Sequence, residues 1–284
     1  SKNIIIGYKG SVNTRYTQGT YAKYALSTSH YYKTKNANLF ASYTFSPRKE
    51  NKTIDSDIRF FNPDGSTNQL WDSDFRRVTR SGAHNLNTIF DFDLSPRQTL
   101  SLTSNILYSP NRTFDNTNRT NISDTNGNAL SSFKNLSDVS QDKTNITLNA
   151  DYNLALRDDK SAFAFTMNYI YYDEDQAQDL NTSYFDAGGA LDRTSTLNFI
   201  TDQRSSILTG QLDFTGLLQE DVSVEMGAKI STINSSSTVD YSGSFTGPGV
   251  IDDDFDYDET IYAAYGSLSK DFNKWSLVLG SRAE

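Results

Sequence analysis

The 284 residues contain no cysteine, which excludes a disulfide framework and any metal site built on thiolates. Two histidines, His30 and His84, leave little for histidine-based catalysis or zinc binding. No apolar run approaches the ~18 residues of a membrane-spanning helix. Basic residues are also scarce relative to acidic ones. The net charge of −9 argues against nucleic acid as the main partner.

Aromatic residues are abundant instead. They make up 13% of the chain, with 17 Tyr and 17 Phe. This richness suits β-strands and the aromatic girdles of membrane barrels. The mean hydropathy of −0.59 resembles that of a soluble protein. A membrane barrel, however, is apolar only at alternate positions, so a low average does not exclude one.

One segment shows this alternation almost without a break. TNITLNADYNLAL at 144–156 places polar residues on one face of a strand and apolar residues on the other, because side chains of a strand alternate. After a charged turn at 157–160 the pattern resumes over 163–172. The apolar positions of the two strands are Ile146, Leu148, Ala150, Tyr152, Leu154, Phe163, Phe165, Met167, Tyr169 and Tyr171. Two such strands of about 10 residues are typical of a transmembrane β-hairpin.

Paired strand candidates around short turns recur along the chain, and about 11 strands are predicted. Between the pairs lie long stretches rich in Asn, Ser, Thr, Asp and Gly, which predict irregular loops: 48–82, 110–141, 173–203 and 233–258. Alternating short and long connections are typical of outer-membrane barrels, whose short turns face the periplasm and whose long loops face outside.

The charges of the predicted strands fall opposite the apolar face. Asp91, Asp93, Asp213, Glu225 and Lys229 therefore belong in a lumen, since charge facing lipid is costly. An interfacial aromatic girdle is expected from Tyr108, Tyr169, Tyr171, Tyr172 and Trp275.

The predicted fold class is all-β, an antiparallel transmembrane β-barrel fragment. An odd number of strands cannot close a bacterial single-chain barrel, and open edges are not tolerated in lipid. The remaining strands are therefore expected from other sequence. The alternative is a soluble β-sandwich or solenoid with one buried face, which would also alternate.

Four segments carry a resemblance to a known family. They are NIIIGYKGSV at 3–12, YALSTSHYYK at 24–33, NLFASYTF at 38–45 and IYAAYGSLSKDFNKWSLVLGSRAE at 261–284. They resemble the first barrel strands and a mid-barrel hairpin of TonB-dependent outer-membrane receptors, especially those of Bacteroidota. Ser281 and Ala283 depart from the usual Leu and Tyr.

The resemblance implies a 22-stranded barrel in the outer membrane, with residues 1–284 as one partial barrel domain forming its N-terminal half. It also implies a plug, a TonB box, a signal peptide and an aromatic C-terminal strand, none of them within this sequence. The implied function is uptake of a scarce, small nutrient ligand. The implied partners are outer-membrane lipid, TonB through the missing parts, and a surface lipoprotein. Nucleic acid is not among them.

Two other functions stay open at this stage. One is a non-transporting outer-membrane or surface adhesin barrel, and the other is a secreted soluble β-rich binding protein. No G-x-S-x-G motif, phosphate loop or H-E-x-x-H motif is present, so neither an enzyme nor a cofactor site is predicted.

Ligand contact is expected from aromatic residues of the predicted loops, because loops on a rigid scaffold carry function. The candidates are Trp71, Phe75, Tyr184, Phe185 and Phe245. The competing interpretation for each is packing of one loop on another. The acidic segment 252–259 could bind a cation such as Ca²⁺, or could be a solvated loop beside an anionic outer leaflet.

Overall fold

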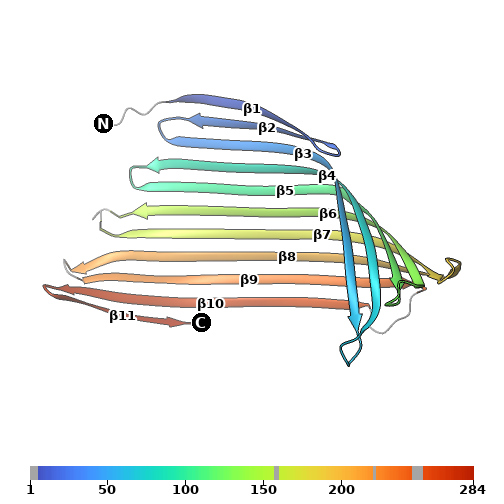
Figure 1. Cartoon of the computed structure of the whole chain (residues 1–284). Coiled ribbons are helices and arrows are strands. Elements are labelled where there is room, and N and C mark those ends of the chain that lie inside the picture. Colours follow the sequence, from blue (N-terminus) through green and yellow to red (C-terminus); the bar gives the residue numbers. More distant parts are fainter. Residues whose placement is uncertain (1–5, 157–159, 220–221, 245–251) are drawn as a thin grey trace.

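The computed structural model describes residues 6–156, 160–219, 222–244 and 252–284. Over these residues the chain forms one antiparallel sheet of 11 strands, in which each strand pairs with its neighbours in sequence (Figure 1). The strands are β1 (Gly7–Gln18), β2 (Ala22–Lys33), β3 (Ala37–Phe61), β4 (Thr67–Ser95), β5 (Gln98–Ser123), β6 (Ala129–Ala155), β7 (Ala162–Asp186), β8 (Leu191–Gln219), β9 (Val222–Gly243), β10 (Asp253–Phe272) and β11 (Trp275–Ala283). The all-β, antiparallel prediction is confirmed.

Within the described residues, no helix is long and apolar enough to cross a membrane.

One face of the sheet is apolar, and we call it the apolar face. The register aligns hydrophobic side chains into rows that cross the strands, because paired residues share a face. One such row consists of Leu39, Phe90, Leu102, Ala150, Met167, Gly210, Ile230 and Tyr262. Met167 remains 40% exposed and Tyr262 68% exposed. Among the described residues, only Val224 and Ala263 are buried hydrophobic side chains, so nothing in the sheet itself covers this face.

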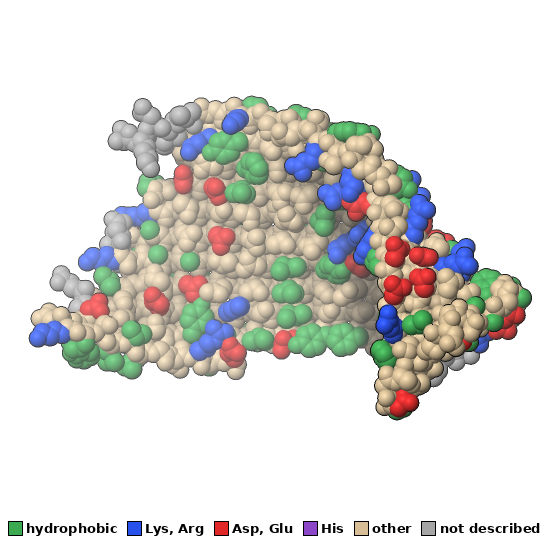
Figure 2. All heavy atoms as spheres, viewed as in Figure 1, with side chains coloured by type: hydrophobic (Ala, Val, Ile, Leu, Met, Phe, Trp, Pro, Cys, Tyr) green, Lys and Arg blue, Asp and Glu red, His purple; other side chains and the backbone are tan. Residues whose placement is uncertain are grey.

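The opposite face is polar, and we call it the polar face. Its side chains bond across strands: Ser101 donates to Asp91 at 2.6 Å, Asn149 to Thr103 at 2.9 Å and Thr166 to Asp151 at 3.0 Å. Figure 2 looks onto this face, where polar side chains and backbone predominate. The register also shows which face of β10 is apolar, which the sequence pattern leaves open. Tyr262, Ala264 and Leu268 lie on the apolar face, and Tyr265 lies on the polar face.

Most of the long polar stretches predicted as loops are strand, which corrects that prediction. β3 to β9 are 22 to 29 residues long, whereas about 9–11 tilted residues cross a membrane. True turns are confined to short segments such as 62–66, 124–128 and 187–190. We call the strand segments within 46–82, 109–143, 172–206, 231–244 and 252–258, with the described turns between them, the polar extension.

The polar extension stays in register because small polar side chains pair across its strands. Ser73 bonds to Thr120 at 2.8 Å, and Ser205 to Ser235 at 2.7 Å. Most side chains on both faces of these segments are polar, and the apolar ones, such as Trp71 and Tyr184, stand among polar neighbours. No hydrophobic period marks them as strand, and their composition therefore resembles that of loops.

β3, β4 and β5 bend sharply where the polar extension begins, and their ends fold over the polar face (Figure 1). Pro47 of β3 pairs with Gly82 of β4 at this level. The register shifts between Arg80 and His84 in the β4–β5 pair, and between Ser109 and Arg112 in the β5–β6 pair. Bulges of this kind bend a strand and increase its twist.

Aromatic clusters border the apolar rows at both ends. At the bend, the His84 ring lies 6.1 Å from Tyr43 and 6.2 Å from Tyr108 between ring centroids. Near the short turns, Phe163 lies 4.9 Å from Phe214, and Phe272 lies 3.8 Å from Trp275. Of the residues expected in the girdle, Tyr108, Tyr169, Tyr171 and Trp275 lie on the apolar face. Tyr172 does not, because it pairs with Asn145 on the polar face.

Two adjacent positions of β6 test the assignment of the faces. Leu148 lies on the apolar face and is 41% exposed, whereas Asn149 lies on the polar face. We expect Leu148→Arg to lower the free energy of unfolding from lipid vesicles by roughly 2–4 kcal/mol, the cost of arginine facing lipid. Asn149→Arg should cost only about 1 kcal/mol, for the lost hydrogen bond to Thr103. Equal costs in urea titrations would contradict the assignment.

Candidate functional site

A row of aromatic rings crosses the polar face near the far end of the polar extension. Phe60 of β3 lies 4.9 Å from Trp71 of β4, and Trp71 lies 5.8 Å from Phe133 of β6, between ring centroids. Phe133 lies 6.3 Å from Tyr184 of β7. The guanidinium of Arg193 in β8 lies 4.3 Å from the centre of the Tyr184 ring. We call these five residues the aromatic row.

The register explains why the rings meet. Trp71 pairs with Ile122 of β5, and Phe133 pairs with Thr120 of the same strand, so the two rings lie diagonally across β5 on one face. Phe133 pairs with Tyr184, and Tyr184 with Arg193. Trp71 is further oriented because its Nε1–H donates to Oε1 of Gln69 at 3.2 Å. These positions lie 40 or more residues apart in sequence between β4, β6 and β7, and only strand pairing brings them together.

The structure brings together part of the set of ligand-contacting residues predicted from sequence. Trp71 and Tyr184 belong to the aromatic row. Phe75 lies on the same face, four residues along β4, where the Arg77 guanidinium lies 5.4 Å from its ring centre. Phe185 follows Tyr184 in a strand and therefore points to the opposite face. Phe245 lies outside the described residues.

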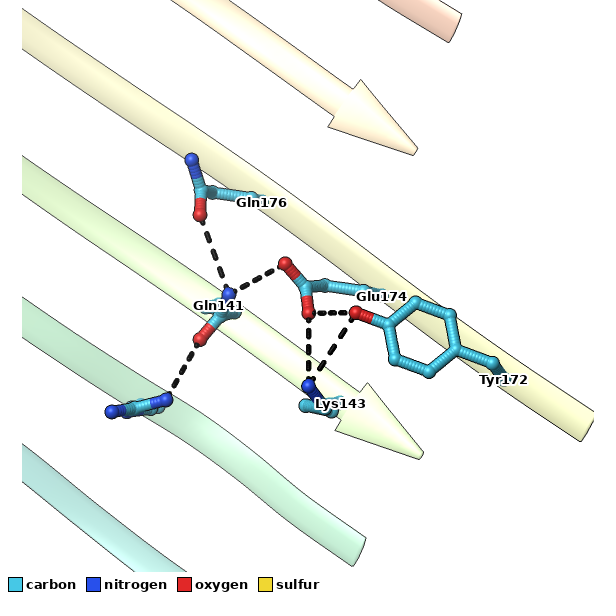
Figure 3. A network of polar contacts seen from close by, with 6 residues as sticks. Gln141, Lys143, Tyr172, Glu174 and Gln176 are labelled. Carbon is cyan, nitrogen blue, oxygen red and sulfur yellow. Dashed lines mark hydrogen bonds and ion pairs between the residues drawn. The ribbon is translucent and has the colours of Figure 1, made fainter. Parts of the chain in front are cut away.

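A polar network lies on the same face where β6 and β7 leave the apolar band (Figure 3). Nε2 of Gln141 donates to Glu174 at 2.7 Å and to Gln176 at 3.4 Å. The Tyr172 hydroxyl donates to Glu174 at 2.5 Å. Nζ of Lys143 lies 3.5 Å from the Glu174 carboxylate and 4.8 Å from the centre of the Tyr172 ring.

Glu174 is the electrostatic centre of this network. Burial alone would raise the pKa of its carboxyl. The hydrogen bonds from Tyr172 and Gln141, together with the charge of Lys143, outweigh burial and hold the pKa below its ordinary value of 4.5. Glu174 is therefore a carboxylate at neutral pH and holds β6 and β7 together through charge-assisted hydrogen bonds.

The acidic segment 252–259 lies mostly on β10 and is not a loop. Its carboxylates alternate between the two faces: Asp254 pairs with Thr238 on one face, and Asp253 with Val239 on the other. In the described part of the chain, no group of three or more His, Asp or Glu residues could hold a metal ion. The structure gives no support to a cation site here.

Gln69 and Arg193 are not among the residues predicted from sequence, because nothing in their local sequence distinguishes them from other polar residues. Only the strand register shows that these two residues lie beside the aromatic rings, and that register can be assigned only after the polar stretches are recognised as strand. Together with the aromatic rings they form a surface with π-faces, an amide and a guanidinium. Such a surface can stack against a sugar or an aromatic ring and bond to its polar edge.

Comparison with protein families identifies part of the chain. Residues 154–284 match the outer membrane protein beta-barrel family. This segment starts at the end of β6 and includes β7 to β11, somewhat less than half of the chain. Comparison with curated proteins and with solved structures gives no match.

The lowered pKa of Glu174 predicts a local pH dependence. A depressed carboxyl pKa contributes stability that is present above the unfolded value, near 4.5, and is lost as pH falls through the folded pKa. We expect amide protection at 141–143 and 172–176 to fall below about pH 4.5, after correction for intrinsic exchange rates.

Glu174→Gln should remove this pH dependence, and Asp138→Asn, on the opposite face of β6, should keep it. Hydrogen-exchange mass spectrometry across this pH range measures both. A pH dependence that persists in Glu174→Gln would contradict the assignment.

Proposed function

Because this chain is an outer-membrane β-barrel protein, we propose that it supplies about half of the barrel of a TonB-dependent receptor. The receptor captures a scarce nutrient on the polar face of its extension and passes it through a plugged lumen when coupled to TonB. The partners are outer-membrane lipid, TonB through a plug, and a lipoprotein over the outer mouth. Location in the outer membrane removes the secreted soluble alternative.

The two edges of the sheet support a larger barrel. In the described residues, β1 pairs only with β2, and β11 only with β10. Unpaired backbone N–H and C=O groups cost several kcal/mol each in hydrocarbon, so an open sheet is not viable there. Further strands that close the sheet would satisfy both edges. A 22-stranded barrel holds a plug in its lumen.

The observation that carries the proposal is the position of the aromatic row. Trp71, Phe133 and Tyr184 lie on the polar face, which is the inner face of a barrel, and beyond the apolar rows. The bent strands fold over this face, so a ligand held there lies above the lumen. Uptake needs such an inward surface. An adhesin would instead bind through surfaces that face away from the lumen.

Neighbouring residues of β7 provide a matched pair for a test. Tyr184→Ala removes a ring of the aromatic row, whereas Phe185→Ala removes a ring from the opposite face of the same strand. The ligand is first identified by comparing accumulation of a ferric siderophore, cobalamin and a labelled oligosaccharide in cells with and without the gene. We expect Tyr184→Ala and Trp71→Ala to weaken binding of that ligand about tenfold, as loss of a central aromatic contact does.

Phe185→Ala should leave binding within about twofold of the unmodified protein. A protonophore should abolish accumulation but leave surface binding intact, because TonB coupling needs the energised inner membrane. Accumulation that is unaffected by gene loss or by the protonophore would contradict the uptake proposal and favour an adhesin.

A further inference from the structure

A cavity of about 400 Å³ lies at the foot of the bend and is strongly basic. The charged side chains that line it are Lys23, Lys49, Lys52, Arg77 and Arg112, with Glu50 as the one carboxylate. We call these residues the basic cradle. The chain as a whole carries a net charge of −9, so this concentration of positive charge opposes its average. Figure 2 shows Lys and Arg side chains gathered inside the bend.

The basic cradle contains a like-charge pair across two strands. Lys52 of β3 and Arg77 of β4 are direct cross-strand partners on the polar face. Like charges in this arrangement destabilise a sheet. Protection of an open strand edge by lysine could account for Lys52 on β3. It does not account for Arg77 and Arg112, which lie on β4 and β5 with paired neighbours on both sides.

The two arginines are held in place without being neutralised. Nε of Arg77 donates to Oδ1 of Asn116 at 2.6 Å, and Nη1 of Arg112 donates to Oε1 of Gln141 at 3.4 Å. Both acceptors are uncharged amides. Over the residues that the structure describes, neither guanidinium makes an ion pair with a carboxylate. Their remaining N–H groups are available for planar, bidentate bonds to an anion.

An aromatic ring fixes the spacing of the two guanidinium groups. Phe114 of β5 lines the same cavity. The guanidinium carbon of Arg112 lies 4.6 Å from the centre of this ring, and that of Arg77 lies 5.3 Å from it. Cation–π contacts of this kind orient a guanidinium but leave its charge in place.

Glu50 forms its ion pair with a lysine and not with Arg77 or Arg112, although the nearby positive charge of Arg112 contributes to lowering the pKa of its carboxyl. Its carboxylate forms an ion pair with Nζ of Lys23 at 2.6 Å. This hydrogen bond is the main reason why the pKa of Glu50 lies below its ordinary value, so that Glu50 is ionised at neutral pH. One carboxylate against five cations still leaves the cavity with an excess of positive charge.

We infer that the basic cradle binds the anionic part of the ligand, a phosphate or carboxylate group on a small molecule, through Arg77 and Arg112. The inference rests on the proposed function in taking that molecule to be the imported nutrient. The site lies on the polar face, so its anion comes from solution rather than from lipid headgroups. The aromatic row continues along the same face, with Phe75 between it and Arg77, and would contact the apolar or sugar part of the same ligand.

The test uses purified protein in detergent, with inorganic pyrophosphate and citrate as probes in isothermal titration at low and physiological salt. Arg77→Gln combined with Arg112→Gln removes both charges and keeps a polar side chain at each position. Arg76→Gln combined with Arg119→Gln is the matched control, because these arginines lie on the opposite face of the same two strands. The net charge changes equally in both variants.

We expect at least one probe to bind the unmodified protein. Its affinity should fall about tenfold or more in the Arg77 and Arg112 variant, from lost charge-assisted hydrogen bonds. It should stay within about twofold in the control. No binding of either probe, or equal losses in both variants, would overturn the inference. Loss only in the Arg76 and Arg119 variant would place the anion on the lipid side and also overturn it.

Binding is measured without TonB or metabolic energy, so it is separable from uptake. Anion binding by a protein that transports nothing would refute the proposed function and leave the basic cradle as an anion site. Nutrient uptake by a protein that binds neither probe would refute the basic cradle alone.

Discussion

The requirement that backbone N–H and C=O groups be paired wherever the chain meets hydrocarbon governs this structure. A continuous antiparallel ladder satisfies it within the sheet, and side chains are left to distinguish the two faces. The apolar face exposes residues such as Met167 and Tyr262 because its partner is lipid, not a second layer of protein. The polar face can then carry Asp91, Asp151 and Asp213, each of which accepts a hydrogen bond from a hydroxyl group on another strand.

Beyond the apolar rows the same ladder continues under a different constraint. Both faces meet water there, so burial no longer selects side chains, and Ser, Thr and Asn pairs hold the register. Freedom from lipid also permits breaks. Pro47, Gly82 and the two bulges lie at the border and bend β3 to β5 over the polar face. That bend places the aromatic row and the basic cradle on one concave surface.

The sequence predicted the membrane part of the fold well, because lipid imposes a strict period of two on residues such as those at 144–154. It predicted the polar extension poorly, because segments with water on both sides have no such period. The missing period of two in these segments also explains why only some of the site residues could be predicted. Trp71 and Tyr184 were found as conspicuous aromatic residues, whereas Phe185 points to the opposite face, since sequence proximity says nothing about face until the strand is known.

Arg77, Arg112 and Arg193 were missed for a related reason. No sequence motif surrounds any of these arginines. Each is positioned by a residue on another strand: Arg77 by Asn116, Arg112 by Gln141 and Arg193 by Tyr184. Tyr172 shows the reverse case. Its position near a strand end predicts a place in the girdle, yet it faces the opposite way from Tyr171, because neighbouring residues in a strand point to opposite faces.

The central claim, that one ladder runs from lipid into water without interruption, is tested most directly by a single-cysteine scan of β6. The chain contains no native cysteine, so each label reports one position. Cysteines at 131–153 are labelled in outer membranes with an environment-sensitive, thiol-reactive fluorophore. From position 144 onward, the account predicts the emission of a fluorophore in lipid at even positions and of a fluorophore in water at odd positions. Below position 143 it predicts the emission of a fluorophore in water at every position. The backbone amides there should nevertheless exchange slowly, because they remain paired in the ladder. Fast exchange below 143, or no alternation above 144, would contradict it.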